Sequence, residues 1–316
     1  LDYASAEGSP DNVVALIIDH KEVWLFGTTS TEVWQNTGTL DTPFEAVPGA
    51  FIEQGCAAPY SVAKADNSIF WLATDPRGEG LVVRANGYIP QRVSTYALDT
   101  AIEAMTTISD AIGFTYQQGG HTFYFLTFPT EQQTWVLDVH NGLWHQRAWL
   151  NPSTGILERH RANCYAFNNG VHLIGDHGEG LTNTSYLYRW SFDIYVDGAY
   201  PQKWLRSWRA LPTGENNLKR SMQHSIQIDG QTGTGLVTGQ GSDPQVLLRW
   251  SDDGGHTWSN YHTRSMGAIG NTGTRVIYRR LGGTQKLRDR VYELSGTDPV
   301  IAAWTAAELE LSGAAS

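Results

Sequence analysis

The sequence predicts an all-β protein, and three features support this prediction. Glycine and aromatic residues are abundant, with 33 Gly, 12 Trp and 14 Tyr among 316 residues, whereas 17% of the residues are charged. Apolar segments with a period of two are separated by turn-forming pairs, as expected of strands. Strand-like runs also end in polar turns at a fairly regular interval, which is typical of a repeat architecture. This composition excludes a largely disordered chain.

The repeat interval is about fifty residues. Five strand-like runs begin at residues 33, 83, 137, 187 and 248, so that their starts are 50, 54, 50 and 61 residues apart. Several strands in a unit of roughly 40–50 residues is the size of a β-propeller blade. We therefore predict a β-propeller-like body of repeated blades in residues 1–214 and a C-terminal β module in residues 215–316. Alternatively, the second part contains further blades of the same ring.

Three local predictions follow from turn and helix signals. The segment TWVLDVHNGLWHQRAW, residues 134–149, reads as strand, tight turn and strand, with Asn141-Gly142 suited to a type I′ hairpin. A helix is expected from about Tyr96 to Thr106, because its apolar residues share one face, with Ser94 or Thr95 as its cap. Residues 299–311 are predicted to form a strand from their alternation, although their alanines would also suit a helix.

The net charge of −10 is unevenly distributed. Residues 1–200 carry 9 Lys and Arg against 22 Asp and Glu, a net −13, whereas residues 201–316 carry 13 against 10, a net +3. An acidic body is a poor surface for wrapping duplex DNA, because phosphate binding depends on clustered Lys and Arg. It would suit a passage that DNA crosses without adhering, although many acidic proteins have such a charge.

Cysteine usage and hydropathy bear on the cellular compartment in which the protein folds. Cys56 and Cys164 are the two cysteines of the sequence, which predicts buried free thiols in a reducing compartment and no disulfide framework. No apolar run approaches membrane-spanning length, and no signal peptide is visible. Asp176–Gly180 (DHGEG) groups two carboxylates and an imidazole, but we interpret it as a glycine-rich turn and predict no metal or cofactor.

The stretch SDDGGHTW, residues 251–258, matches S-x-D-x-G-x-T-W, the Asp box of sialidases and other β-propellers. The residues predicted to form this motif are Ser251, Asp253, Gly255 and Trp258. We predict a structural hairpin whose tryptophan plugs a blade, and no catalytic residues. A sialidase would need three converging arginines, a tyrosine nucleophile with a glutamate partner and an aspartic acid, and no spacing in the chain singles out such a set.

A basic run near the C-terminus is a candidate for contact with an acidic partner or DNA. It consists of Arg279, Arg280, Lys286, Arg288 and Arg290. Its alternative interpretation is the solvated face of two strands joined by a turn at residues 281–283.

Longer stretches are more distinctive than these motifs. They include PGAFIEQGCAAP (residues 48–59), VRANGYIPQRVST (83–95), GQGSDPQV (239–246) and RDRVYEL (288–294). Together with the SDDGGHTW motif, they resemble the packaged-DNA stabilisation proteins of P22-like short-tailed phages, also called tail accessory factors or tail hubs. The resemblance spans nearly the whole chain, and family members look longer at the N-terminus, so we expect this chain to start inside the family pattern.

The resemblance implies a virion protein without enzymatic activity. Such proteins are expected to form a hexameric ring below the portal and its adaptor, assembled in the bacterial cytoplasm. They extend the channel for double-stranded DNA without sequence-specific binding, retain the packaged DNA, receive the tail needle or plug, and dock tailspikes or fibres. Two alternatives remain open from the sequence: a glycan-binding or sialidase-like propeller that recognises host polysaccharide, and a scaffold propeller with a protein ligand.

Overall fold

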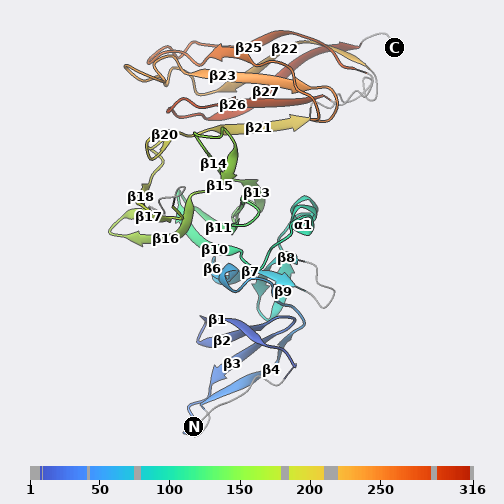
Figure 1. Cartoon of the computed structure of the whole chain (residues 1–316), viewed down its shortest axis with the longest axis vertical. Coiled ribbons are helices and arrows are strands. Elements are labelled where there is room, and N and C mark those ends of the chain that lie inside the picture. Colours follow the sequence, from blue (N-terminus) through green and yellow to red (C-terminus); the bar gives the residue numbers. More distant parts are fainter. Residues whose placement is uncertain are drawn as a thin grey trace. The chain divides into compact units, whose positions relative to one another are not determined.

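The computed structural model describes residues 8, 10–40, 43–74, 80–178, 185–209, 220–285 and 290–313. The chain divides into two compact units, Leu1–Trp190 and Ser191–Ser316. Strands dominate both units (Figure 1), which confirms the all-β prediction. Among the described residues, no helix is long and apolar enough to cross a membrane. The expected boundary near residue 215 falls outside the described residues, and strand β21 (Trp204–Arg209), which precedes it, pairs within the second unit.

The first unit contains four successive antiparallel sheets and a small hairpin. The first sheet has the order β1 (Val13–Asp19), β2 (Glu22–Gly27), β3 (Thr31–Asn36), β4 (Phe44–Ile52). The second has β5 (Gly55–Cys56), β7 (Ser68–Thr74), β8 (Gly80–Asn86), β9 (Ile89–Arg92), with β6 (Ala63–Ala65) also paired to β7. The third has β10 (Ile112–Gln118), β11 (His121–Phe128), β12 (Gln133–Asp138), β13 (Leu143–Gln146). The fourth has β16 (Ala162–Asn168), β17 (Val171–Asp176), β18 (Leu187–Trp190), and the hairpin is β14 (Ala148–Leu150) with β15 (Leu157–Arg159).

The repeat seen in the sequence corresponds to a repeated strand position. Its first four runs fall on β3, β8, β12 and β18, each of which is the third strand of its sheet. The fifth run falls on β23 (Gln245–Ser251), which belongs to the second unit. This run therefore lies outside the four sheets of the first unit.

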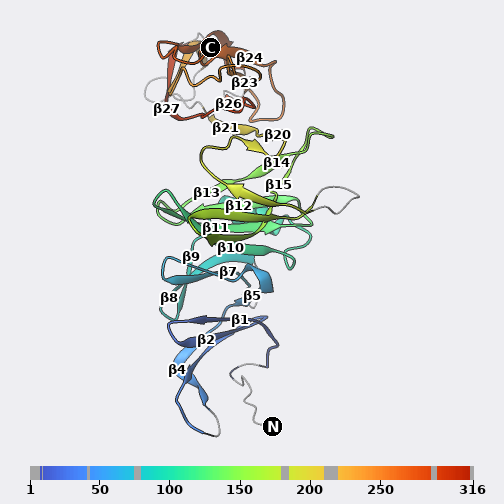
Figure 2. The same ribbon diagram turned by 90° about the vertical axis from the view of Figure 1, so that its left-hand side faces the viewer.

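The sheets of the first unit stack face to face (Figure 2). Successive side chains of a strand point to opposite faces. Ile69 and Trp71 of β7 accordingly pack against the first sheet, whereas Phe70 and Leu72 pack against the third. Because both faces of β7 are covered, residues 69–73 are apolar at five consecutive positions and do not alternate.

Several local predictions can now be compared with the structure. Helix α1 spans Tyr96–Glu103, and the side chain of Thr95 accepts a hydrogen bond from the Leu98 N–H at 3.4 Å. The Asn-Gly turn is not type I′, because it is a four-residue loop in which Gly142 alone has a positive φ, of 71°. Cys56 is buried as expected, but Cys164 is exposed.

The second unit is built from two antiparallel sheets that enclose one core. One sheet has the order β21, β26 (Val291–Gly296), β23, β24 (His262–Ser265), and the other has β25 (Val276–Gly283), β22 (Ser221–Gly230), β27 (Trp304–Gly313). A short hairpin of β19 (Val196–Asp197) and β20 (Tyr200–Pro201) precedes them. Side chains from both sheets, including Ile226, Tyr278 and Leu248, form the core. Strand β27 confirms the predicted C-terminal strand. The prediction of a turn at residues 281–283 is wrong, because these residues continue β25.

Candidate functional site

The SDDGGHTW segment folds into a hydrogen-bonded turn after β23. The Ser251 hydroxyl donates to Asp253 Oδ1 at 2.6 Å and accepts from the Gly255 N–H at 2.8 Å. Asp253 also accepts from the backbone and the hydroxyl of Thr257, at 2.8 and 2.6 Å. The hydrogen bond from Ser251, followed by those from Thr257, holds the pKa of Asp253 well below its usual range. The carboxylate is thus committed to the turn and is a poor proton donor at neutral pH.

The sequence suggested that Trp258 fills a space within a propeller blade. The structure does not agree, because Trp258 lies in the second unit. Its ring covers the guanidinium of Arg249 at 4.5 Å, and Tyr261 contacts the same group at 4.9 Å. Arg249 also makes a two-bond ion pair with Glu293, at 2.6 and 3.0 Å. These contacts tie the turn to β23 and β26, so the geometry favours a structural role.

The residues of the candidate basic patch have different environments. Arg279 and Arg280 are exposed on β25, whereas Lys286 and Arg288 lie outside the described residues. Arg290 is 1% exposed and pairs with Asp252 at 2.6 and 2.8 Å. Its remaining donors reach the carbonyl oxygens of residues 281, 282 and 283. The patch interpretation is therefore wrong for Arg290. Its guanidinium is engaged by Asp252 and by carbonyl oxygens at the end of β25.

The two exposed arginines border a hollow of about 470 Å³. Arg280 has a φ of 64°, at an irregularity where the pairing of β22 with β25 shifts register. Such bulges redirect side chains out of the regular pleat. Glu310 lies in the same hollow and accepts a hydrogen bond from Ser225 at 2.8 Å. The described lining contains neither a tyrosine nor a third arginine, so it does not supply the set that a sialidase requires.

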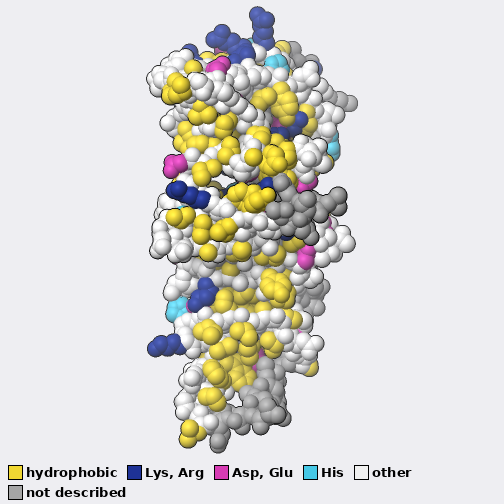
Figure 3. Space-filling view, turned by 60° about the vertical axis from the view of Figure 1, so that its left-hand side comes forward, with side chains coloured by type: hydrophobic (Ala, Val, Ile, Leu, Met, Phe, Trp, Pro, Cys, Tyr) yellow, Lys and Arg dark blue, Asp and Glu magenta, His cyan; other side chains and the backbone are white. Residues whose placement is uncertain are grey.

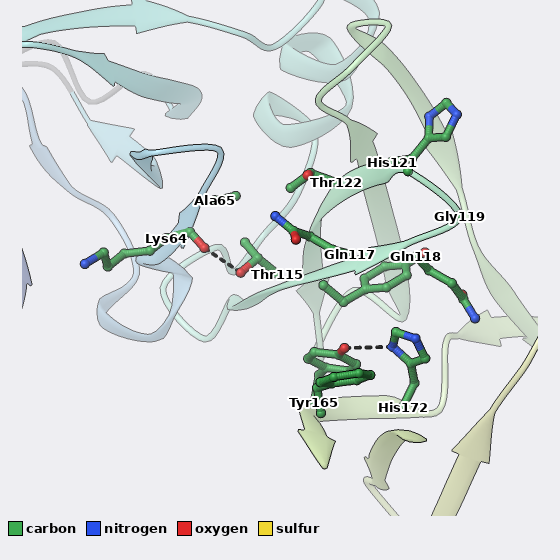
Figure 4. A pocket seen from close by; sticks show the side chains of 13 residues that line it. Lys64, Ala65, Thr115, Gln117, Gln118, Gly119, His121, Thr122, Tyr165 and His172 are labelled. Atoms are coloured by element: carbon green, nitrogen blue, oxygen red, sulfur yellow. Dashed lines mark hydrogen bonds between the residues drawn. The ribbon is translucent and has the colours of Figure 1, made fainter. Parts of the chain in front are cut away.

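A larger hollow, of about 730 Å³, surrounds the free edge of β10 in the first unit (Figure 4). Lys64 lines one side, and the Tyr165 hydroxyl and His172 Nδ1, 2.8 Å apart, line the other. Sequence reasoning missed this site. The signal that could have found it is the run of polar residues Gln117, Gln118 and Thr122 around the Gly-Gly turn of an otherwise aromatic hairpin.

The metal interpretation of the DHGEG segment finds no support among the described residues. They contain no group of three or more His, Cys, Asp or Glu side chains that could hold a metal ion. Asp176 instead pairs with the buried Arg161 at 2.5 Å. Glu179 and Gly180 lie outside the described residues.

The fold is thus a stack of antiparallel sheets in the first unit and a two-sheet module in the second. Two family models match the chain: "Bacteriophage P22 Gp10, beta-propeller" over residues 1–185 and "Bacteriophage P22 Gp10, beta-sandwich" over residues 204–312. The chain belongs to the bacteriophage P22 Gp10 family, and it has a structural role in a phage tail. This result confirms the resemblance and the predicted fold class.

Two other comparisons add little. No curated protein matches the chain. Among solved structures, an exo-inulinase from Aspergillus awamori is 9% identical, with coverage of 93% of this chain and 65% of that chain and a TM-score of 0.18. The chain thus spans less than two thirds of that enzyme, and a likeness this low says nothing about fold or activity.

Proposed function

We propose that this protein is the hub of a short phage tail. In this role it forms a hexameric ring below the portal and its adaptor, retains the packaged DNA, and docks the tail needle and the tailspikes or fibres. The observation that carries the proposal is the match of both family models, in the order propeller then sandwich, to one chain. A phage structural protein of this family acts by assembling with other virion proteins.

Exposed apolar surface in the first unit supports an assembly role. On β1, Leu16 is 64% exposed and Ile18 is 61% exposed. Hydrophobic side chains gather in patches on the surface (Figure 3). Contiguous exposed apolar surface of this kind is typical of protein–protein contacts.

The negative charge of residues 1–200 supports a role as a conduit for DNA. Residues 1–200 carry a net charge of −13, from 9 basic and 22 acidic residues. Because affinity for the phosphate backbone depends on Lys and Arg, an acidic wall repels duplex DNA and lets it move without sequence-specific binding. The net +3 of residues 201–316 is suited to an acidic neighbour in the tail.

Immunogold labelling of whole virions tests the proposal directly. Antibodies against the chain should label the vertex where head and tail meet, beneath the portal. Label at the outer tips of spikes or fibres would contradict the hub role and favour the glycan-binding alternative.

Charge reversal tests the contribution of the basic residues. We expect R279E/R280E/R288E to reduce incorporation into tails, because charges at an interface rim govern encounter and partner choice. The matched control is R206E, which reverses an exposed arginine on β21. Circular dichroism should show both proteins folded. Equal incorporation of the triple variant and the control would refute a role for the patch.

A further inference from the structure

The hollow around β10 is lined on both sides of an edge strand, and its two sides are here called lobes. The strand order places β10 at the edge of the third sheet, where it pairs with β11 alone among the described strands. Because side chains alternate along a strand, Thr115 and Gln117 point to one face, and Tyr116 and Gln118 to the other. Figure 4 shows Gln117 near Thr122 on the first side and Gln118 on the side of Tyr165 and His172.

Side chains without a hydrogen-bond partner among the described residues line both lobes. The side chains of Gln117, Gln118 and Thr122 make no hydrogen bond to any other residue that the structure describes. An amide offers two donors and an acceptor, and a hydroxyl offers both functions. The lobes therefore present paired donors and acceptors, which match ligands rich in hydroxyl groups.

The charged and titratable groups at the hollow are already engaged. Lys64 pairs with Asp19 at 2.9 Å and donates to the Ile18 carbonyl at 2.8 Å. His121 is held by Asp138 at 2.8 Å, and His172 by Tyr165. No carboxylate is among the lining residues that the structure describes. A strongly charged ligand would thus find no free counter-ion here.

The second lobe contains an exposed aromatic surface. Phe167 is 60% exposed, and its ring lies 4.9 Å from that of His172. The polar C–H bonds on one face of a pyranose ring pack well against an aromatic face, while its hydroxyls reach neighbouring amides. Aromatic rings beside a few oriented polar groups are the usual composition of small-ligand sites.

We propose that this hollow binds a neutral oligosaccharide, with a sugar ring against Phe167 and hydroxyls bonded to Gln117, Gln118 and Thr122. This inference does not depend on the proposed hub role. It also differs from a sialidase-like site, because the described lining has neither the arginines that bind an acidic sugar nor the carboxylates that a sialidase uses in catalysis.

Single-stranded nucleic acid is the main competing ligand, since its bases also stack on aromatic rings. Its phosphates, however, need a cationic track. Lys64 is the one Lys or Arg among the described lining residues, and it is paired with Asp19. The observations therefore favour the saccharide.

Isothermal titration calorimetry of the whole chain tests the proposal. The probes are maltotetraose, cellotetraose and isomaltotetraose, with sialyllactose and a short oligothymidine as charged comparisons. We expect at least one neutral tetraose to bind with a Kd on the order of 1 mM, and the charged probes to bind more weakly.

Variants locate the binding site. F167A should weaken binding about fivefold through loss of a ring contact, and F167W should restore it. Q117A/Q118A should also weaken binding. The control is Y96A, which removes a ring that is 83% exposed on α1, and its affinity should be unchanged.

Three results would overturn the proposal. They are the absence of saturable binding by all three neutral tetraoses, tighter binding of either charged probe, and binding that F167A and Y96A weaken equally. Matching thermal unfolding curves for all variants would exclude a folding defect as the cause.

Discussion

The two units of the chain bury their strands in different ways, although both consist of antiparallel sheets. In the first unit, Ser68–Ala73 of β7 are buried at six consecutive positions, because sheets cover both faces. In the second unit, β22 alternates at its start, with Ser221 and Gln223 buried and Met222 and His224 exposed. A strand covered on both faces, such as β7, thus carries buried side chains at successive positions, whereas the start of β22, which is covered on one face, alternates.

This difference also determines where a substitution is tolerated. A side chain on either face of β7 is in a core, whereas the exposed Met222 and His224 of β22 can change with little effect. The four predictions below test this contrast, from the largest expected effect to the smallest.

The W71A substitution should have the largest effect. Trp71 is fully buried, packs edge-on against Phe26 at 5.2 Å and donates to the Gly55 carbonyl at 3.2 Å. Its removal should destabilise the first unit by about 4 kcal/mol. Hydrogen–deuterium exchange should show faster exchange in residues 1–190 and unchanged exchange in residues 220–313. The control is M222A, at an outward position of β22, which should change stability little; equal acceleration in both units by W71A would contradict independent cores.

The R290A substitution should destabilise the second unit by about 3 kcal/mol, because it leaves the Asp252 carboxylate, on a side chain that is 10% exposed, without its partner. The control R279A removes an exposed arginine and should change stability by less than about 0.5 kcal/mol. Urea unfolding combined with hydrogen exchange measures both effects. Similar losses of stability for R290A and R279A would show that the burial of Arg290 does not make it more important for stability than the exposed Arg279.

Acid should affect the first unit before the second. Burial, followed by the nearby charge of Arg147, lowers the pKa of His160 to about 3. Since this pKa lies below the unfolded value of about 6.5, the unfolded state binds the proton more readily. Stability should therefore fall as the pH drops below about 6.5, by at most about 1.4 kcal/mol per pH unit. Burial lowers the pKa of His177 as well, which adds to the same trend.

Urea unfolding of the first unit at about pH 7 and about pH 5 measures this loss. In H160Q, a Gln oxygen can accept the hydrogen bond that the Ala162 N–H now donates to His160 Nδ1 at 3.1 Å. The variant should show a shallower pH dependence. An unchanged pH dependence would mean that His160 is not the group responsible.

The smallest effect is expected for the turn of the second unit. The folded pKa of Asp253 is depressed by its hydrogen bonds from Ser251 and Thr257, so its contribution is present above about pH 4 and is lost as the pH falls below that value. D253N should lower the thermal midpoint of the second unit by about 2 °C at neutral pH and flatten its response below about pH 4. Calorimetry measures the shift, and a D253N midpoint equal to that of the unsubstituted protein at neutral pH would contradict the assignment.

Local features were predictable because their causes are local. The Thr95 cap of α1 and the hydrogen-bonded turn at Ser251–Asp253 depend on neighbours within a few residues. The Asn-Gly turn was predicted less well, since its loop length follows from how β12 and β13 pair. The prediction of a basic patch was wrong at Arg290, because the partner of this arginine, Asp252, is 38 residues away in the sequence.

The sequence by itself determined the strand-rich composition, the repeat that marks the third strand of each sheet, the helix at residue 96 and the family resemblance. These depend on residue types and on short-range periodicity. Only the tertiary structure decided that Arg290 is buried, that the fifth repeat lies in the sandwich, and that Lys64, Gln117 and Tyr165 surround one hollow. The physical reason is that burial and juxtaposition depend on strands far apart in the chain, as in the pairing of Ser221 with Gly313.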